Sequence, residues 1–277
     1  MAKIDKSKLT KQQIRELMEQ KRQRKLHKLF AKNYKANNEP TQNNVVLLKH
    51  GKKYSAEYVN KIFRMVKKYT TLPVTVHCVT EDPTGITPEV RIIKLPTNSW
   101  TSGWWYKPYI FSKDLPVEGT ILYMDLDIVI TANIDKLFTY NPGKFCVIRD
   151  FTRVMRPNWP KFNSSIMRFE KGQLDMVYTK FEKNAQNIMK RFFGDQDYLF
   201  DEMQNNATLW PDNWIMSWKW EIRKSKQFAP NGRRGERKLA VKEDVYPPES
   251  CCIAVFHGDP NPHNCEDPFI VDNWHKI

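Results

Sequence analysis

Short apolar segments alternate with segments of helical periodicity between residues 44 and 256, and this alternation constrains the fold most strongly. Val45–Leu48 is continuously apolar, as expected for a strand buried on both faces. A helix is predicted to follow, with Ser55 as its N-cap and Tyr69 near its end. Further strands are predicted at Val74–Cys78, Val90–Ile93, Thr120–Met124, Phe145–Ile148 and Ile253–Phe256, and helices at residues 174–191 and 196–204. This order predicts an α/β fold with a mainly parallel sheet flanked by helices.

The segment ILYMDLDIVI places two carboxylates, Asp125 and Asp127, inside an apolar run. Residues two apart on a strand point to the same face, so the carboxylates are predicted to converge. Such a pair is costly to desolvate, and a hard divalent cation would relieve the repulsion. The carboxyl end of a parallel strand is also where α/β sheets bind ligands. The alternative is a strand end with two exposed aspartates, one of which caps the next turn.

Composition restricts the class of protein. No apolar run reaches the ~18 residues that a membrane-spanning helix requires, and the charged N-terminus has no secretory signal. Five scattered cysteines argue against a disulfide framework, and their spacing relative to the histidines does not match the usual zinc sites. We therefore expect a cytoplasmic protein, located in the host cytoplasm if a phage encodes it.

The net charge of +14 is concentrated in two regions. Residues 1–42 carry twelve Lys and Arg against four Asp and Glu, a net charge of +8. This segment is predicted to be a basic helical arm with a linker, followed by one domain at residues 43–277. The arm is either a solvated helix or a helix that binds nucleic acid or a membrane surface.

Several motifs occur together in an order that resembles the GT-A glycosyltransferases, especially their family-8-like branch. The resemblance covers roughly residues 45–260 and depends on VVLLKHGKKYSAEYVNKIFRMVKKY, VHCVTED, GWWYKPYIF, YMDLD with VITANIDKLF, FNSSIMRFEKG, GDQDYL and FHGDPNP. It implies a Rossmann-like GT-A domain and a nucleotide-sugar donor, with uridine as the base. It also implies a divalent metal, Mn²⁺ or Mg²⁺, held by Asp125, Asp127 and His257. The alternative for His257 is a histidine that merely ends a core strand.

The resemblance assigns further residues to the donor site. We expect donor-binding groups at Lys107, Asn163, Ser164, Gly258, Glu81 and Asp82, and catalytic groups at Asp195 and Gln196. Simpler alternatives remain for most of them. Lys107 could be a surface lysine, Asn163 and Ser164 could form a polar turn, and Glu81 and Asp82 could form an exposed turn. One of Asp195 and Asp197 could cap the next helix. No protein nucleophile is evident, and the resemblance favours retention of anomeric configuration. An inverting reaction would require a carboxylate base, for which Asp195 and Asp212 are candidates.

The acceptor is predicted from charge. A second basic cluster, with aromatic residues beside it, follows residue 217, and such a combination suits nucleic acid. The acceptor-binding candidates are Arg223, Lys224, Arg233, Arg234, Arg237, Lys238, Trp218 and Lys219. The leading hypothesis is transfer to hydroxylated bases in DNA, as phage DNA-modifying glycosyltransferases do. The alternatives are transfer to lipopolysaccharide or another cell-surface glycan, and a non-catalytic nucleic-acid-binding protein on a transferase fold.

Overall fold

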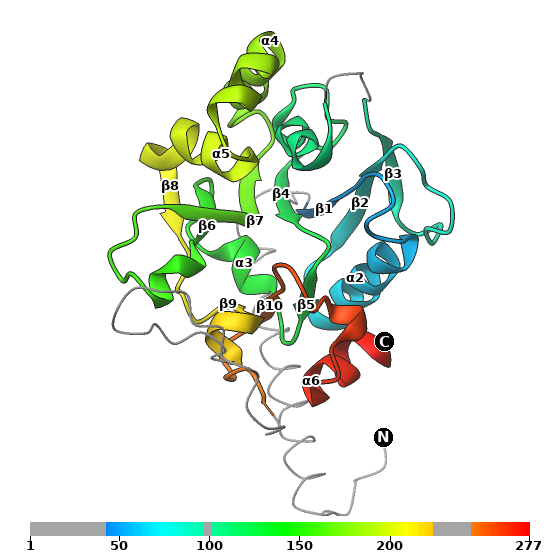
Figure 1. Cartoon of the computed structure of the whole chain (residues 1–277). Helices are drawn as coiled ribbons and strands as arrows, with labels where there is room; N and C mark the ends of the chain where they lie inside the picture. Colours follow the sequence, from blue (N-terminus) through cyan, green and yellow to red (C-terminus); the bar gives the residue numbers. More distant parts are fainter. Residues whose placement is uncertain (1–42, 97–100, 224–244) are drawn as a thin grey trace, which may run out of the picture. The chain divides into compact units, whose positions relative to one another are not determined.

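The computed structural model describes residues 43–96, 101–223 and 245–277, all of which belong to the unit Gln42–Ile277 (Figure 1). The predicted basic arm at residues 1–42 lies outside the described residues. Most of the predicted basic cluster, residues 224–244, lies outside them as well. In the described part of the chain, no helix is both long and apolar enough to cross a membrane.

A seven-stranded sheet forms the centre of the unit, with strand order β3-β2-β1-β4-β7-β6-β8 (Figure 1). Neighbouring strands from β3 to β4 are parallel, β7 is antiparallel to β4 and β6, and β8 is parallel to β6. The strands are β1 Asn43–Lys49, β2 Val74–Thr80, β3 Arg91–Lys94, β4 Thr120–Met124, β6 Phe145–Arg149, β7 Phe162–Glu170 and β8 Ala207–Leu209. The predicted mainly parallel α/β sheet is confirmed.

A second sheet of three short strands has the order β5-β10-β9. It contains β5 Ile128–Ile130, β9 Ile215–Ser217 and β10 Ile253–Val255. β10 pairs with β5 in antiparallel orientation and with β9 in parallel orientation. Because β5 begins directly after Asp127 and β10 ends two residues before His257, this sheet brings the two predicted metal-binding segments to one edge.

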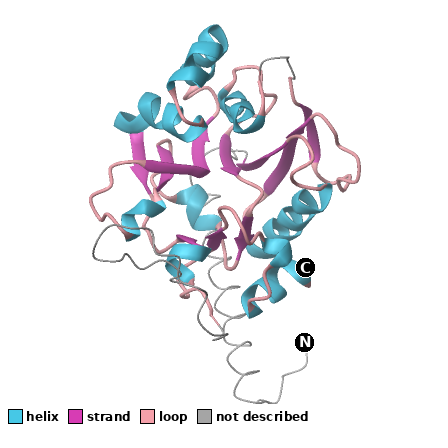
Figure 2. Cartoon of the chain, in the orientation of Figure 1, coloured by secondary structure: helices cyan, strands magenta, loops and turns pink. Residues whose placement is uncertain are grey.

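Helices cover both faces of the large sheet (Figure 2). The principal ones are α2 Ala56–Tyr69, α3 Asp135–Thr139, α4 Asp175–Arg191, α5 Asp195–Met203 and the 3-10 helix η2 Gly103–Phe111. Alternate residues of a strand face opposite sides, and β1 divides accordingly. Val45 and Leu47 belong to the core that contains α2 and the small sheet, whereas Val46 belongs to the core that contains η2, α4 and α5.

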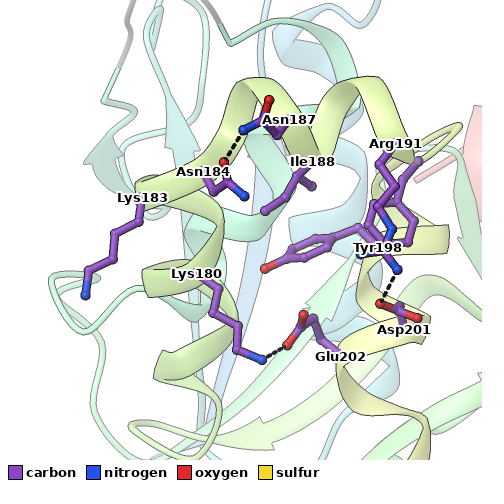
Figure 3. Close-up of a pocket in the computed structure, with 10 residues that line it drawn as sticks. Lys180, Lys183, Asn184, Asn187, Ile188, Arg191, Tyr198, Asp201 and Glu202 are labelled. Carbon is purple, nitrogen blue, oxygen red and sulfur yellow. Dashed lines mark hydrogen bonds and ion pairs between the residues drawn. The ribbon is translucent and has the colours of Figure 1, made fainter.

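A pocket of about 440 Å³ lies between α4 and α5 (Figure 3). Ion pairs join the two helices there, Lys180 to Glu202 at 2.6 Å and Arg191 to Asp201 at 3.8 Å. The lining residues are Lys180, Lys183, Asn184, Asn187, Ile188, Arg191, Phe192, Tyr198, Asp201 and Glu202. None of them is a predicted site residue, so this pocket is separate from the candidate active site.

Candidate active site

The predicted site residues gather at one edge of the large sheet because of its register. Leu47 of β1 lies opposite both Cys78 of β2 and Met124 of β4. The segments that carry Glu81 and Asp125 therefore leave the sheet at the same edge, at the carboxyl ends of parallel strands. The antiparallel strand β7 begins at this edge, and its first residues include Asn163 and Ser164.

Lys107 is at the centre of the site. Its ammonium nitrogen lies 3.0 Å from Oδ1 of Asp125 and 3.1 Å from Oδ2 of Asp195. Ser164 contributes a third contact, with 3.3 Å between its Oγ and the lysine Nζ. The side chain is only 9% exposed. The predicted donor-binding lysine thus joins η2, β4 and α5 by contacts with two buried or half-buried carboxylates.

The Lys107 ammonium and the neighbouring carboxylates stabilise one another's charged forms. Burial alone lowers the pKa of Lys107, but the carboxylates of Asp125 and Asp195 outweigh it and hold the pKa above its usual value. Burial raises the pKa of Asp195, and Asp125 raises it further, whereas the Lys107 ammonium lowers it. Removal of the lysine would leave two carboxylates close together in a buried site, which is strongly unfavourable.

The two aspartates of the D-x-D segment have different environments. Asp125 accepts a hydrogen bond from the Tyr123 hydroxyl at 2.7 Å in addition to its contact with Lys107. Asp127 accepts one from the Tyr54 hydroxyl at 3.0 Å. Burial, together with the nearby Asp125 carboxylate, raises the pKa of Asp127 to about 6. Asp127 is therefore the less well compensated of the two carboxylates.

Gln196 is held in a fixed orientation by two residues. Its Oε1 accepts the backbone N–H of Ser164 at 3.2 Å, and its Nε2 donates to Oδ2 of Asp150 at 3.0 Å. Asn163 accepts the backbone N–H of Ser165 at 2.9 Å, so its amide stabilises the start of β7. Asp195 and Gln196 lie in the first turn of α5, whose N-cap is Gly194. Neither Asp195 nor Asp197, one of which was the alternative helix cap, occupies the N-cap position.

His257 follows β10 and has a well-defined environment. Its Nε2 lies 2.6 Å from Oγ of Ser217, and the Trp220 ring approaches it edge-on at 4.8 Å between centroids. The backbone N–H of Phe256 donates to the carbonyl of Asp127 at 2.8 Å, so the two predicted metal-binding segments are adjacent. In the described part of the chain, no three His, Cys, Asp or Glu side chains converge as a metal-binding group.

The turn after His257 is approached by a lysine. Gly258 has a φ of +80°, a conformation that strongly favours glycine. Nζ of Lys219 lies 3.8 Å from the position of a Cβ on this glycine, and it donates to the backbone carbonyls of His257 and Asp259. Lys219, predicted from sequence as an acceptor-binding residue, thus lies against the predicted donor-binding glycine.

Two other described members of the predicted acceptor cluster interact with a single carboxylate. Trp218 is 2% exposed, and its indole N–H donates to Oδ2 of Asp267 at 2.8 Å. Arg223 forms an ion pair with the same side chain and donates from Nε to Oδ2 at 2.9 Å. The polar groups of both residues are therefore engaged within the fold. The remaining members, Lys224, Arg233, Arg234, Arg237 and Lys238, lie outside the described residues.

Glu81 and Asp82 occupy the turn after β2. Oε1 of Glu81 accepts the backbone N–H of Gly51 at 2.5 Å, and Nζ of Lys49 donates to the carbonyl of Asp82 at 3.2 Å. Asp82 also accepts the backbone N–H of Thr84 at 3.0 Å. These contacts join the ends of β1 and β2 at the site edge.

The side chains at the site that were not predicted from sequence include Asp150, which accepts a hydrogen bond from Gln196, and also Tyr54, Tyr123 and Ser217. Tyr123 could have been found, because it lies two residues before Asp125 on the same strand and therefore on the same face. Tyr54 and Ser217 reach Asp127 and His257 from distant parts of the chain. No local pattern indicates those contacts.

The chemistry of the donor set suits a divalent cation. Mg²⁺ and Mn²⁺ prefer oxygen ligands, and Mg²⁺ is commonly held by one or two carboxylates together with substrate phosphates. Asp125 and Asp127 supply such carboxylates, and their mutual repulsion in a buried site favours a cation between them. These two residues therefore fit a divalent metal.

The comparisons with known proteins identify the fold. No family model and no curated protein matches the sequence. Among solved structures, the glycosyltransferase GlyE of Streptococcus pneumoniae TIGR4 is similar, with a TM-score of 0.59 and 12% identity over 84% of this chain. This chain spans 60% of the GlyE chain. The galactosyltransferase LgtC has a TM-score of 0.56 and 11% identity, with 84% of this chain and 94% of LgtC covered.

A third similar structure is the bifunctional glycosyltransferase WbbM, with a TM-score of 0.56 and 13% identity over 86% of this chain and 50% of WbbM. At these identities the similarity establishes the architecture. The described residues therefore share the GT-A fold of these glycosyltransferases, as predicted.

Proposed function

We propose that the protein is a metal-dependent glycosyltransferase. It would move a sugar from a nucleotide-sugar, specifically a UDP-sugar, to a hydroxyl group of an acceptor. One observation carries this proposal: the Asp125–Lys107–Asp195 cluster lies at the carboxyl edge of a GT-A sheet. Ligands bind at this edge in open α/β sheets, and buried charged groups in such a place are candidates for function.

Asp125 and Asp127 would hold the metal, Mn²⁺ or Mg²⁺. His257 is the proposed third ligand because the residue before it is hydrogen-bonded to the Asp127 backbone. When bound, the cation would neutralise negative charge on the leaving nucleoside diphosphate. Gly258 would allow the diphosphate to approach the backbone closely, and the Lys219 ammonium beside that turn would add positive charge.

In the proposed reaction, an acceptor oxygen bonds to the anomeric carbon as the bond from that carbon to the diphosphate oxygen breaks. The acceptor proton leaves with the released nucleotide. We favour retention because both candidate bases for inversion are ion-paired, Asp195 with Lys107 and Asp212 with Arg149. Each of these carboxylates is already engaged with a cation of the fold. Asn163, Ser164 and Gln196 would position the donor sugar through hydrogen bonds.

Two acceptor classes follow from the sequence, a hydroxylated base in DNA and a glycan. The DNA hypothesis depends on basic residues of which most lie outside the described part of the chain, and two described members, Arg223 and Trp218, are bound to Asp267. The charge of α5 favours a glycan. This helix carries Asp195, Asp197, Asp201 and Glu202 and no basic residue. Each of these carboxylates is ion-paired to a cation of a neighbouring element, so this surface has no surplus positive charge for a phosphate backbone.

The test is a donor screen. Purified protein is incubated with a set of nucleotide-sugars, with Mn²⁺, with Mg²⁺ or with EDTA, and nucleotide release is measured by chromatography. We expect release from one nucleotide class only when a divalent metal is present. A protein that binds nucleic acid but releases no nucleotide from any donor would instead fit the non-catalytic alternative.

A further inference from the structure

Two adjacent tryptophans at the start of η2 have opposite environments. Trp105 is 8% exposed, and its ring stacks on Phe181 of α4 with centroids 5.8 Å apart and planes 8° apart. Trp104 is 53% exposed. Trp105 therefore anchors η2 in the core, while the indole of Trp104 remains accessible on the surface.

Trp104 lies against the residue that begins α5. A Cβ on Gly194 would be 3.3 Å from the indole Nε1, 3.7 Å from Cε2 and 3.8 Å from Cδ1. The backbone of Gly194 is extended, with φ −162° and ψ 177°, so any residue could adopt it. The glycine is thus not required by backbone conformation. Its small size allows the edge of the indole to lie close to the start of α5.

This contact places the indole beside the candidate active site. The same two elements, η2 and α5, are joined a second time by the ion pair between Lys107 and Asp195. Asp195 directly follows Gly194, and Gln196 follows Asp195. The exposed aromatic surface of Trp104 therefore adjoins the turn that presents both proposed catalytic residues.

The chemistry of this surface indicates its ligand. A pyranose ring has an apolar C–H face that can stack on an indole, while its hydroxyl groups form hydrogen bonds at the ring edge. The carboxylate and amide side chains in the first turn of α5 accept hydrogen bonds of that kind. The cations nearest this turn are already paired with carboxylates of α5, Lys107 with Asp195 and Lys161 with Asp197, so they offer no surplus positive charge for a DNA backbone.

We propose that Trp104, seated on Gly194, is an acceptor subsite that takes the pyranose ring of a neutral glycan. This inference rests on the proposed glycosyltransferase function and extends it to the acceptor. The glycan ring stacks on the indole, and the hydroxyl that receives the sugar lies on the Asp195 side. Trp104 acts on affinity for the acceptor and takes no part in donor binding.

The experiment measures acceptor and donor kinetics separately. Metal-dependent nucleotide release is recorded without acceptor, with a panel of neutral mono- and disaccharides, and with duplex DNA that contains hydroxymethylcytosine. Wild type is compared with Trp104→Ala, with Trp104→Phe, which retains a ring, and with Ile92→Ala, an exposed apolar control on β3. Thermal melting checks that each variant is folded.

We expect the KM for the glycan to rise about tenfold in Trp104→Ala and less in Trp104→Phe, since one stacking contact contributes roughly 1.4 kcal/mol. The donor KM and the release rate without acceptor should not change, and Ile92→Ala should match wild type. Gly194→Ala, whose Cβ would lie 3.3 Å from the indole Nε1 and so shift the ring slightly, should raise the glycan KM by a smaller factor.

Three results would overturn the inference. One is stimulation by hydroxymethylated DNA and by no neutral glycan. Another is an equal change of donor KM and acceptor KM in Trp104→Ala, which would indicate a general effect on η2. The third is the absence of both stimulation and binding, by saturation-transfer NMR, with every glycan of the panel. Nucleotide release without acceptor shows in each case whether the proposed function itself holds.

Discussion

The ammonium group of Lys107 lies 3.1 Å from the Asp195 carboxylate, and this buried ion pair ties η2 to the first turn of α5. The same ammonium contacts Asp125, so one cation connects the proposed metal-binding strand with the proposed catalytic turn. Neither carboxylate is well solvated, and each depends on this cation for compensation. The arrangement of the site and the stability of the fold are therefore linked at Lys107.

Substitution of Lys107 tests that link. Lys107→Met would leave Asp125 and Asp195 close together without their shared cation, and loss of one partner of a buried ion pair costs about 3–5 kcal/mol. We expect a decrease of this order in the free energy of unfolding, measured with urea. Lys171→Met is the control, because Lys171 bonds only backbone carbonyls. Equal stability of the two variants would contradict the account.

Tyr54 donates a hydrogen bond to the side chain of Asp127 at 3.0 Å, and its removal tests the role of that carboxylate. Groups that orient a metal ligand typically contribute 10–100-fold in metal affinity or activity. We expect Tyr54→Phe to raise the Mn²⁺ concentration for half-maximal activity by about tenfold. Tyr106→Phe is the matched control, because its ring packs against His50, which directly follows β1, with centroids 5.3 Å apart. An unchanged metal dependence in Tyr54→Phe would count against Asp127 as a ligand.

Ser217 tests the proposed role of His257. Its hydroxyl is within 2.6 Å of the imidazole Nε2 and also accepts the backbone N–H of Trp220 at 3.0 Å. If His257 is a metal ligand, Ser217→Ala should weaken metal activation by about tenfold or more, with a smaller change in the donor KM at saturating metal. If both Ser217→Ala and His257→Ala keep the wild-type metal dependence, His257 is not a ligand.

Arg223 separates a structural role from an acceptor role. Its guanidinium is paired with Asp267, which is 3% exposed, and its substitution would leave that buried carboxylate with Trp218 alone. We expect Arg223→Gln to destabilise the protein by about 3 kcal/mol in urea unfolding, with an unchanged acceptor KM at a temperature where the variant is folded. A raised acceptor KM in an Arg223→Gln variant of wild-type stability would instead indicate that Arg223 binds the acceptor.

The strands of the large sheet were predictable where apolar runs are long. β4 matches its predicted bounds, Thr120–Met124, because a buried parallel strand requires apolar residues on both faces. The strands β8 and β9 have three residues each, which is too short for a periodic signal, and the sequence analysis did not predict them.

The residues of the candidate site were easier to predict from sequence than the contacts between them. Asp125 was singled out from its own motif, and Lys107 and Asp195 from the family resemblance, but their mutual ion pairs depend on how η2 and α5 pack against the sheet. Trp218 and Lys219 show the opposite case. Their composition suggested an exposed basic and aromatic surface, whereas one is buried and the other lies against the Gly258 turn.

The most direct test of the central claim is the rate of nucleotide release from a nucleotide-sugar in the presence of Mn²⁺. Wild type is compared with Asp127→Asn, which removes a charge but little volume, and with Asp114→Asn, an exposed aspartate in a turn. The account predicts release by wild type and by Asp114→Asn, and loss of at least about a hundredfold in Asp127→Asn. Equal metal-dependent release by all three proteins, or no release by wild type with any donor, would contradict it.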